Sequence, residues 1–242
     1  MSTHIKDNLL LVCGKSGSGK SASLMNVSNH ESILLMNCEA GKKLPFKNDI
    51  KSVVITKPAQ VLQGFAAAEK SDKIELIAID TFTYLMDMFE SQNVINSSNT
   101  MKGWQDYGQY IKTLMQDCVA NCSKDVVFLA HTKTDLNETE GVMETYVPVK
   151  GAAKGNGFES YFSNVVATKK MSLEELEPYE NDNLIITEDD EILGFKHVFQ
   201  TRLTKATKDE RIRAPIGMWE REETFIDNDV EKVLNRLREF YA

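Results

Sequence analysis

Eight residues near the start of the chain have the types and spacing needed to bind phosphate groups. They read GKSGSGKS over residues 14–21 and fit the pattern G-x-x-x-x-G-K-[ST] in full. Glycines let the backbone curl so that successive N–H groups face one anion, and a following helix N-terminus adds a positive dipole. An apolar run at residues 9–13 and a helix expected at residues 21–28 supply the strand–loop–helix setting that this motif requires. The motif therefore predicts a site for a nucleoside triphosphate.

The individual residues of this loop suit ATP bound with Mg²⁺. Lys20 is expected to bridge the β- and γ-phosphates and so to act in catalysis, and the Ser21 hydroxyl is expected to bind the metal. The expected nucleotide-binding residues are Gly14, Lys15, Ser16, Gly17, Ser18, Gly19, Lys20, Ser21 and Ala22.

Three further polar residues follow apolar, strand-like runs, and each has an ordinary alternative role. Asp80 ends the run IELIAID and is expected to hold Mg²⁺, although it could simply cap the next helix. Glu39, in LLMNCEAG, is a candidate to activate water, or an ordinary loop residue. His131 ends DVVFLAH and could sense the γ-phosphate, or could hydrogen-bond within a turn.

The elements that must position these residues alternate between strand and helix. Continuous apolar strands separated by helices indicate an α/β fold with a mostly parallel central sheet flanked by helices on both faces. We expect strands at residues 9–13, 32–37, 51–56, 75–79, 125–130, 164–170 and 197–205, with helices starting at Pro58 and spanning residues 82–90, 104–122 and 229–241. Residues 133–157 are expected to form a polar loop.

Length and composition favour one domain over residues 1–242. The 242 residues carry a net charge of −8, which argues against coating nucleic acid by bulk charge but leaves a local basic patch possible. No stretch is apolar enough to span a membrane, and the short N-terminal apolar run predicts no signal peptide. Four cysteines without CxxC spacing fit a cytoplasmic protein with reduced thiols.

The acidic charge is concentrated in one stretch, at about residues 172–191. It contains nine acidic residues and no Lys or Arg, so the remainder of the chain is close to neutral. We expect a solvated surface insertion, with a docking strip as the alternative. The helix expected at residues 229–241 is amphipathic and should pack on the core of its own chain.

Together these motifs resemble the RecA-like P-loop ATPases, and most closely the compact RecA-core proteins of bacteriophages that act in single-strand annealing and recombination. The resemblance covers about residues 8–170 and is carried by GKSGSGKS, MNCEAG, IELIAIDT, WQDYGQYIKTL and DVVFLAHTK. Glu39 is paired with an Asp80 that is followed by Thr81 and not by Glu, and this pairing favours a RecA-like over an AAA+ arrangement. The resemblance implies an ATPase stimulated by single-stranded DNA that forms a homo-oligomer, either a ring or a filament.

The resemblance also implies two accessory contacts. In RecA-like proteins the loop that follows the strand with the γ-phosphate sensor touches single-stranded DNA. Here that loop corresponds to residues 133–157, which contain Lys150 and Lys154. A basic finger on a late strand reaches the ATP of the neighbouring subunit, and TRLTKATKDERIRAP offers Lys205, Lys208, Arg211 and Arg213 for that role. A flexible surface loop and a charged hairpin are the respective alternatives.

Two other functions remain open at this point. A nucleoside or other small-molecule kinase would share the phosphate loop and could use TKDERIRAP as a lid. A helicase-loader-type protein would use ATP as a conformational switch and the acidic stretch as a contact surface. A single-strand-binding or replication protein is a possible partner.

Overall fold

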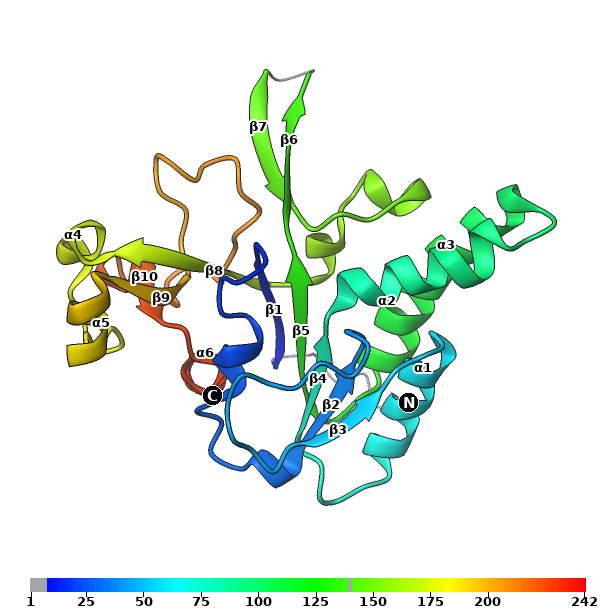
Figure 1. The fold of residues 1–242 in the computed structure, drawn as a ribbon, viewed down its shortest axis with the longest axis horizontal. Coiled ribbons are helices and arrows are strands. Elements are labelled where there is room, and N and C mark those ends of the chain that lie inside the picture. The colour runs from blue at the N-terminus through cyan, green and yellow to red at the C-terminus, as the bar shows by residue number, and fades with distance from the viewer. Residues whose placement is uncertain (1–7, 139–140) are drawn as a thin grey trace.

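An eight-stranded sheet forms the centre of the molecule (Figure 1). The computed structural model describes residues 8–138 and 141–242. The prediction of no signal peptide rests partly on residues 1–7, which lie outside these ranges, as does Glu140 of the expected DNA loop. The order of strands across the sheet is β10-β9-β8-β1-β5-β4-β2-β3. Their bounds are β1 Leu9–Gly14, β2 Ile33–Asn37, β3 Lys51–Val54, β4 Leu76–Asp80, β5 Asp125–His131, β8 Asn164–Ser172, β9 Phe195–Gln200 and β10 Phe225–Asp227.

The strands from β8 to β3 are parallel, as the sequence predicts. β1, β2, β4 and most of β5 are buried, which is why they read as continuous apolar runs. In the pairing register Gly14 lies opposite His131, and Asn37 lies opposite Asp80. The carboxyl ends of β1, β2, β4 and β5 therefore meet at one edge of the sheet.

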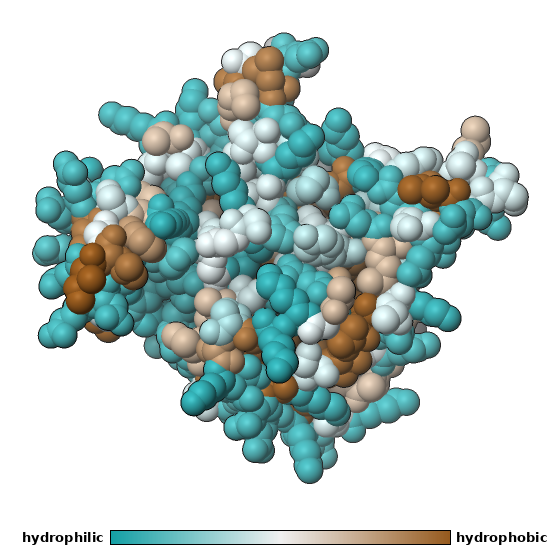
Figure 2. All heavy atoms as spheres, viewed as in Figure 1, coloured by the Kyte–Doolittle hydropathy of each residue, from teal (hydrophilic) through white to brown (hydrophobic). Residues whose placement is uncertain are grey.

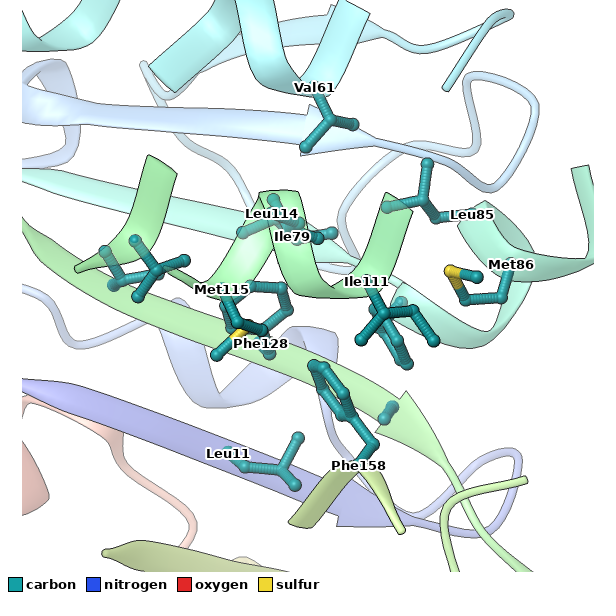
Figure 3. Packing of buried hydrophobic residues seen from close by; sticks show 14 of the residues in the cluster. Leu11, Val61, Ile79, Leu85, Met86, Ile111, Leu114, Met115, Phe128 and Phe158 are labelled. Carbon is teal, nitrogen blue, oxygen red and sulfur yellow. The ribbon is translucent and has the colours of Figure 1, made fainter. Parts of the chain in front are cut away.

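Helices cover the two faces of the sheet. Against one face lie α1 (Ala59–Glu69), α2 (Phe82–Phe89) and α3 (Thr100–Lys112), and Figure 3 shows how their apolar side chains meet those of β1, β4 and β5. The other face is covered mainly by α6 (Val230–Tyr241), whose Val233 and Leu234 are buried against it. The C-terminal amphipathic helix is thus confirmed, and it packs on its own core.

Several local predictions were wrong. The helix after the phosphate loop is a single 3-10 turn, Ser21–Leu24, and does not continue to residue 28. Residues 133–157 are not simply a loop, because β6 (Lys133–Asn137) and β7 (Val142–Tyr146) form an antiparallel hairpin. Figure 1 shows this hairpin standing away from the sheet beyond the end of β5.

The C-terminal third adds antiparallel strands, as expected. β9 pairs with β8 and β10 pairs with β9, both antiparallel. The acidic insertion between β8 and β9 carries two short helices, α4 (Leu173–Leu176) and α5 (Glu188–Leu193). Strand β9 ends at Gln200, so the expected late strand carrying the basic finger is replaced by an irregular segment at residues 201–220. Within the described ranges, no helix has the length and apolar character to cross a membrane.

Candidate functional site

The phosphate loop leaves the buried strand β1 at Gly14 and ends in the 3-10 turn at Ser21. Gly17 and Gly19 have φ angles of 75° and 105°, in the region that side-chain-bearing residues rarely adopt. These two glycines are therefore required for the curl that turns the backbone N–H groups toward an anion. Because the following turn is so short, the anion site depends on the loop amides more than on a helix dipole.

Lys20 lies inside this loop and is only 5% exposed. Its ammonium group donates hydrogen bonds to the carbonyl oxygens of Gly14 (3.0 Å) and Lys15 (2.8 Å). Burial lowers the pKa of Lys20 to about 8, while the nearby carboxylate of Asp80 acts in the opposite direction. A buried charge without an oppositely charged partner is unfavourable, and a bound phosphate group would supply that partner for this ammonium.

Asp80 lies at the carboxyl end of β4 and faces the phosphate loop. Its Oδ2 accepts a hydrogen bond from the Ser21 hydroxyl at 2.7 Å. Its Oδ1 is buried without a hydrogen-bond partner among the described residues. Burial raises the pKa of Asp80 to about 6, and the Ser21 hydrogen bond partly offsets that effect. The Ser21 hydroxyl oxygen and the unpartnered Oδ1 of Asp80 adjoin each other, and such atoms fit the preference of Mg²⁺ for hard oxygen ligands.

Glu39 and His131 meet at the same edge of the sheet. Glu39 Oε1 lies 3.5 Å from His131 Nε2, without the geometry of a hydrogen bond, and Glu39 Oε2 is 2.9 Å from the ammonium of Lys42. Burial and the charge of Lys20 lower the pKa of His131, and Glu39 acts in the opposite direction. Lys42 is a member of this cluster that the sequence analysis missed.

Two residues from the C-terminal third also hold the phosphate loop, and the sequence analysis missed both. His197 on β9 places Nδ1 2.9 Å from the carbonyl oxygen of Ser18; since a carbonyl only accepts, Nδ1–H is the donor. The side-chain amide of Asn228, just after β10, donates to the carbonyl oxygen of Gly19 at 2.8 Å. The loop is thus anchored by two residues that lie far away in the sequence.

A cavity of about 430 Å³ opens beside the phosphate loop. Its walls come from the loop, from the distal half of β8, from the β6–β7 hairpin and from residues 210–212. Arg211 lies in this wall, where Nε and Nη2 donate to Glu144 Oε1 at 2.8 and 2.7 Å. Nη1 of Arg211 is 3.4 Å from Oε2 of the buried Glu159, so this guanidinium is engaged within its own chain.

The remaining predicted cations lie outside this cluster. Arg213 and Lys208 are exposed on the irregular segment 201–220, where Arg213 pairs through its backbone with Val165. Lys150 forms an ion pair with Glu90, and Lys154 is exposed on a neighbouring 3-10 turn. The structure therefore brings together Lys20, Ser21, Asp80, Glu39 and His131, and places Lys150, Lys154, Lys208 and Arg213 elsewhere on the surface.

The fold and the phosphate loop define the class of protein: a P-loop nucleotide-binding protein with a mostly parallel sheet. A comparison with protein families makes the assignment more specific, because the AAA domain family AAA_24 matches residues 6–197. The chain belongs to this family of the P-loop NTPase superfamily, and an ATPase domain binds and hydrolyses nucleotide. A search of curated proteins gave no match.

Proposed function

We propose that this protein is a Mg²⁺-dependent, RecA-like ATPase that acts on single-stranded DNA in phage recombination, repair or replication. The observation that carries the proposal is the convergence of Lys20, Ser21, Asp80, Glu39 and His131 at one edge of the parallel sheet. A carboxylate at the end of β2, which β5 and β4 separate from β1 and its phosphate loop, and which is not next to Asp80 in the sequence, is the arrangement that the resemblance to compact phage RecA cores implies.

Each side chain has a defined task in this proposal. The ammonium of Lys20 binds the phosphates, after exchanging its loop carbonyl partners for phosphate oxygens. Ser21 and Asp80 hold Mg²⁺, which neutralises charge on the phosphates when bound. Glu39 orients and deprotonates the attacking water, and His131 beside it responds to the state of the γ-phosphate.

Contacts with DNA are assigned to the side of the molecule that carries the hairpin and the turn after it. Lys150 and Lys154 are both exposed there and can approach a phosphodiester backbone. The hairpin stands clear of the sheet (Figure 1). We further propose that the protein works as a homo-oligomer in which Arg213 or Lys208 approaches the nucleotide of the next subunit.

The test is ATP turnover measured with Mg²⁺, with and without single-stranded oligodeoxynucleotide. We expect turnover to rise at least several-fold with DNA. The Lys20→Ala variant lacks the phosphate-binding ammonium, so its residual turnover gives the background rate of the assay. Turnover that is indifferent to DNA would refute the DNA role while leaving the ATPase assignment intact. Turnover that rises with nucleosides and not with DNA would instead identify a small-molecule kinase.

A further inference from the structure

The two ends of the central sheet differ in how their edge strands are covered. At one end the acidic insertion lies along β10, where the Asp227 N–H donates to the Asn183 carbonyl at 2.8 Å and Asn181 donates to the Phe225 carbonyl at 3.0 Å. At the other end β3 pairs with β2 alone among the described strands, and all four of its residues are exposed. An uncovered edge strand is a template for association with another chain.

The covered end carries an exposed aliphatic cluster surrounded by acidic side chains, which we call the acidic face. Its aliphatic residues are Ile185, Ile186, Ile192 and Leu193, which are 58%, 39%, 82% and 60% exposed. Its exposed acidic residues are Glu174, Glu175, Glu177, Glu180, Asp182, Glu188, Asp189 and Glu191. Figure 2 shows strongly hydrophobic atoms over α5, ringed by hydrophilic ones.

The insertion that carries this face is anchored to the sheet. Leu176 and Leu184 are buried against Val198 of β9 and Phe225 of β10. Its two helices begin with capping boxes, at Ser172 and Thr187. The four exposed aliphatic residues are thus displayed on an ordered support, and such clusters on a protein surface mark contact sites.

The uncovered end of the sheet has the opposite charge, and we call it the β3 edge. Val53 and Val54 of β3 are 40% and 46% exposed. The exposed lysines of residues 42–57 are Lys42, Lys43, Lys47, Lys51 and Lys57, against a single exposed acidic residue, Asp49. Exposed aliphatic side chains surrounded by positive charge thus lie at one end of the sheet, and exposed aliphatic side chains surrounded by negative charge at the other.

We propose that the acidic face of one copy docks on the β3 edge of a second copy. Seven strand spacings separate the two edges, about 34 Å, so they cannot meet within one molecule. Two different patches that complement each other form a head-to-tail contact, which continues from copy to copy into a ring or a filament. This inference rests on the proposed self-association but is independent of DNA binding.

The test uses charge reversal on each patch, followed by mixing. Glu188→Lys with Glu191→Lys reverses the acidic face, and Lys51→Glu with Lys57→Glu reverses the β3 edge. By sedimentation velocity at low salt, we expect each variant alone to dissociate to monomers at a concentration at least tenfold above that of the wild type. An equimolar mixture should associate again. In the mixture the reversed acidic face of one variant meets the reversed β3 edge of the other, and the native acidic face meets the native β3 edge, so both contacts join opposite charges.

The controls separate this contact from other effects. Asp106→Lys with Asp117→Lys makes the same change in charge on an exposed part of the α3 region and should leave association unchanged. Ile192→Ser should weaken association without changing charge, and circular dichroism confirms that each variant is folded. Variants that associate like the wild type, or a mixture that stays monomeric, would overturn the proposal.

The same samples distinguish failure of this inference from failure of the proposed function. DNA-stimulated ATP turnover by a protein that stays monomeric, or by an oligomer insensitive to these reversals, would overturn the docking and leave the function standing. Assembly that follows the expected pattern without any stimulation by DNA would support the docking and refute the DNA role.

Discussion

At the scale of single residues, Glu39 is the group on which hydrolysis is proposed to depend. Its two carboxylate oxygens face different neighbours, His131 on one side and Lys42 on the other. This fixes the orientation of the carboxylate at the edge of the sheet. A fixed acceptor near the phosphate loop is what a general base requires.

Replacing this carboxylate should separate ATP binding from ATP hydrolysis. Glu39→Gln keeps the size of the side chain but cannot take a proton, so turnover should fall about 100-fold or more while ATP affinity changes little. Turnover assays and equilibrium binding of a fluorescent ATP analogue measure the two quantities. Glu75→Gln, an exposed residue just before β4, is the matched control. Unchanged turnover in Glu39→Gln would support the nucleotide-switch alternative.

His131 predicts a pH dependence of stability. Its folded pKa lies below the ordinary value of 6.5, chiefly because of burial, so below that value the unfolded chain binds more protons than the folded chain. Stability should therefore fall as the pH drops through 6.5 toward the lowered pKa. Between pH 7.5 and pH 5.5, thermal unfolding should show a larger loss for the wild type than for His131→Gln. Equal losses in the two proteins would contradict this account, and His30→Gln, which keeps His131, should behave as the wild type does.

The sequence predicted the residues whose signal is local. Lys20 and Ser21 belong to one contiguous motif, and Asp80 follows a buried strand whose apolar run reads plainly. His197 and Asn228 gave no such signal, because each acts through one hydrogen bond to a carbonyl about 180 or more positions away. Contacts of that kind depend on the packing of the whole sheet and have no pattern of their own.

At the scale of elements, the antiparallel strands β9 and β10 serve the phosphate loop as well as the sheet. Asn228 follows β10 and bonds the Gly19 carbonyl, and a side chain at Gly19 would collide with it at 2.8 Å. Glycine is thus required at this position for its φ angle and for its lack of a side chain.

Removing this anchor should loosen the loop without removing its chemistry. Loss of one net hydrogen bond corresponds to about 1 kcal/mol, so Asn228→Ala should raise the KM for ATP about fivefold with a smaller change in kcat. Steady-state kinetics over a range of ATP concentrations measures both parameters. Asn235→Ala, on the exposed side of α6, is the control. A loss confined to kcat would show that Asn228 does not position the loop.

The β6–β7 hairpin shows why one element was missed. Its strands lie outside the central sheet, and most of their side chains are polar, so no apolar alternation marks them as strands. Gly141, with a φ angle of 67°, was the available turn signal. β10 escaped detection for a different reason, because three residues are too few to display a period.

At the scale of the whole molecule, the arginines of the irregular segment differ in their attachments. Arg211 is held by Glu144 and by the buried Glu159, whereas the side chain of Arg213 is exposed. Of these two arginines, Arg213 is therefore the better placed to reach a neighbouring subunit.

The two arginines should give opposite results when each is removed. Arg211→Ala leaves Glu159 without its cation, so the free energy of unfolding should fall by about 2 kcal/mol. Arg213→Ala should leave stability unchanged and reduce turnover at least tenfold, but only at concentrations where the protein is assembled. Denaturant unfolding and turnover against protein concentration measure these effects. An equal loss of turnover in monomers would count against a role in trans.

The general architecture was predictable because one physical rule governs it. Strands buried on both faces must be apolar throughout, so the apolar runs of β1, β4 and β5 predicted a parallel sheet. The ends of these runs also predicted the edge of the sheet where the site lies. The detail that was not predictable, such as the irregular course of residues 201–220, depends on contacts with β8 and the hairpin that no local pattern encodes.

The bond between Gly19 and Asn228 joins residues 209 positions apart. A ribosome adds residues one at a time, so the loop is made well before its last support, which follows 209 residues later. A nascent polypeptide halted before Asn228 would carry the full phosphate-binding motif and still hold it loosely. Full affinity for nucleotide should thus arise only after Asn228 has been made, and shorter nascent chains should bind nucleotide weakly.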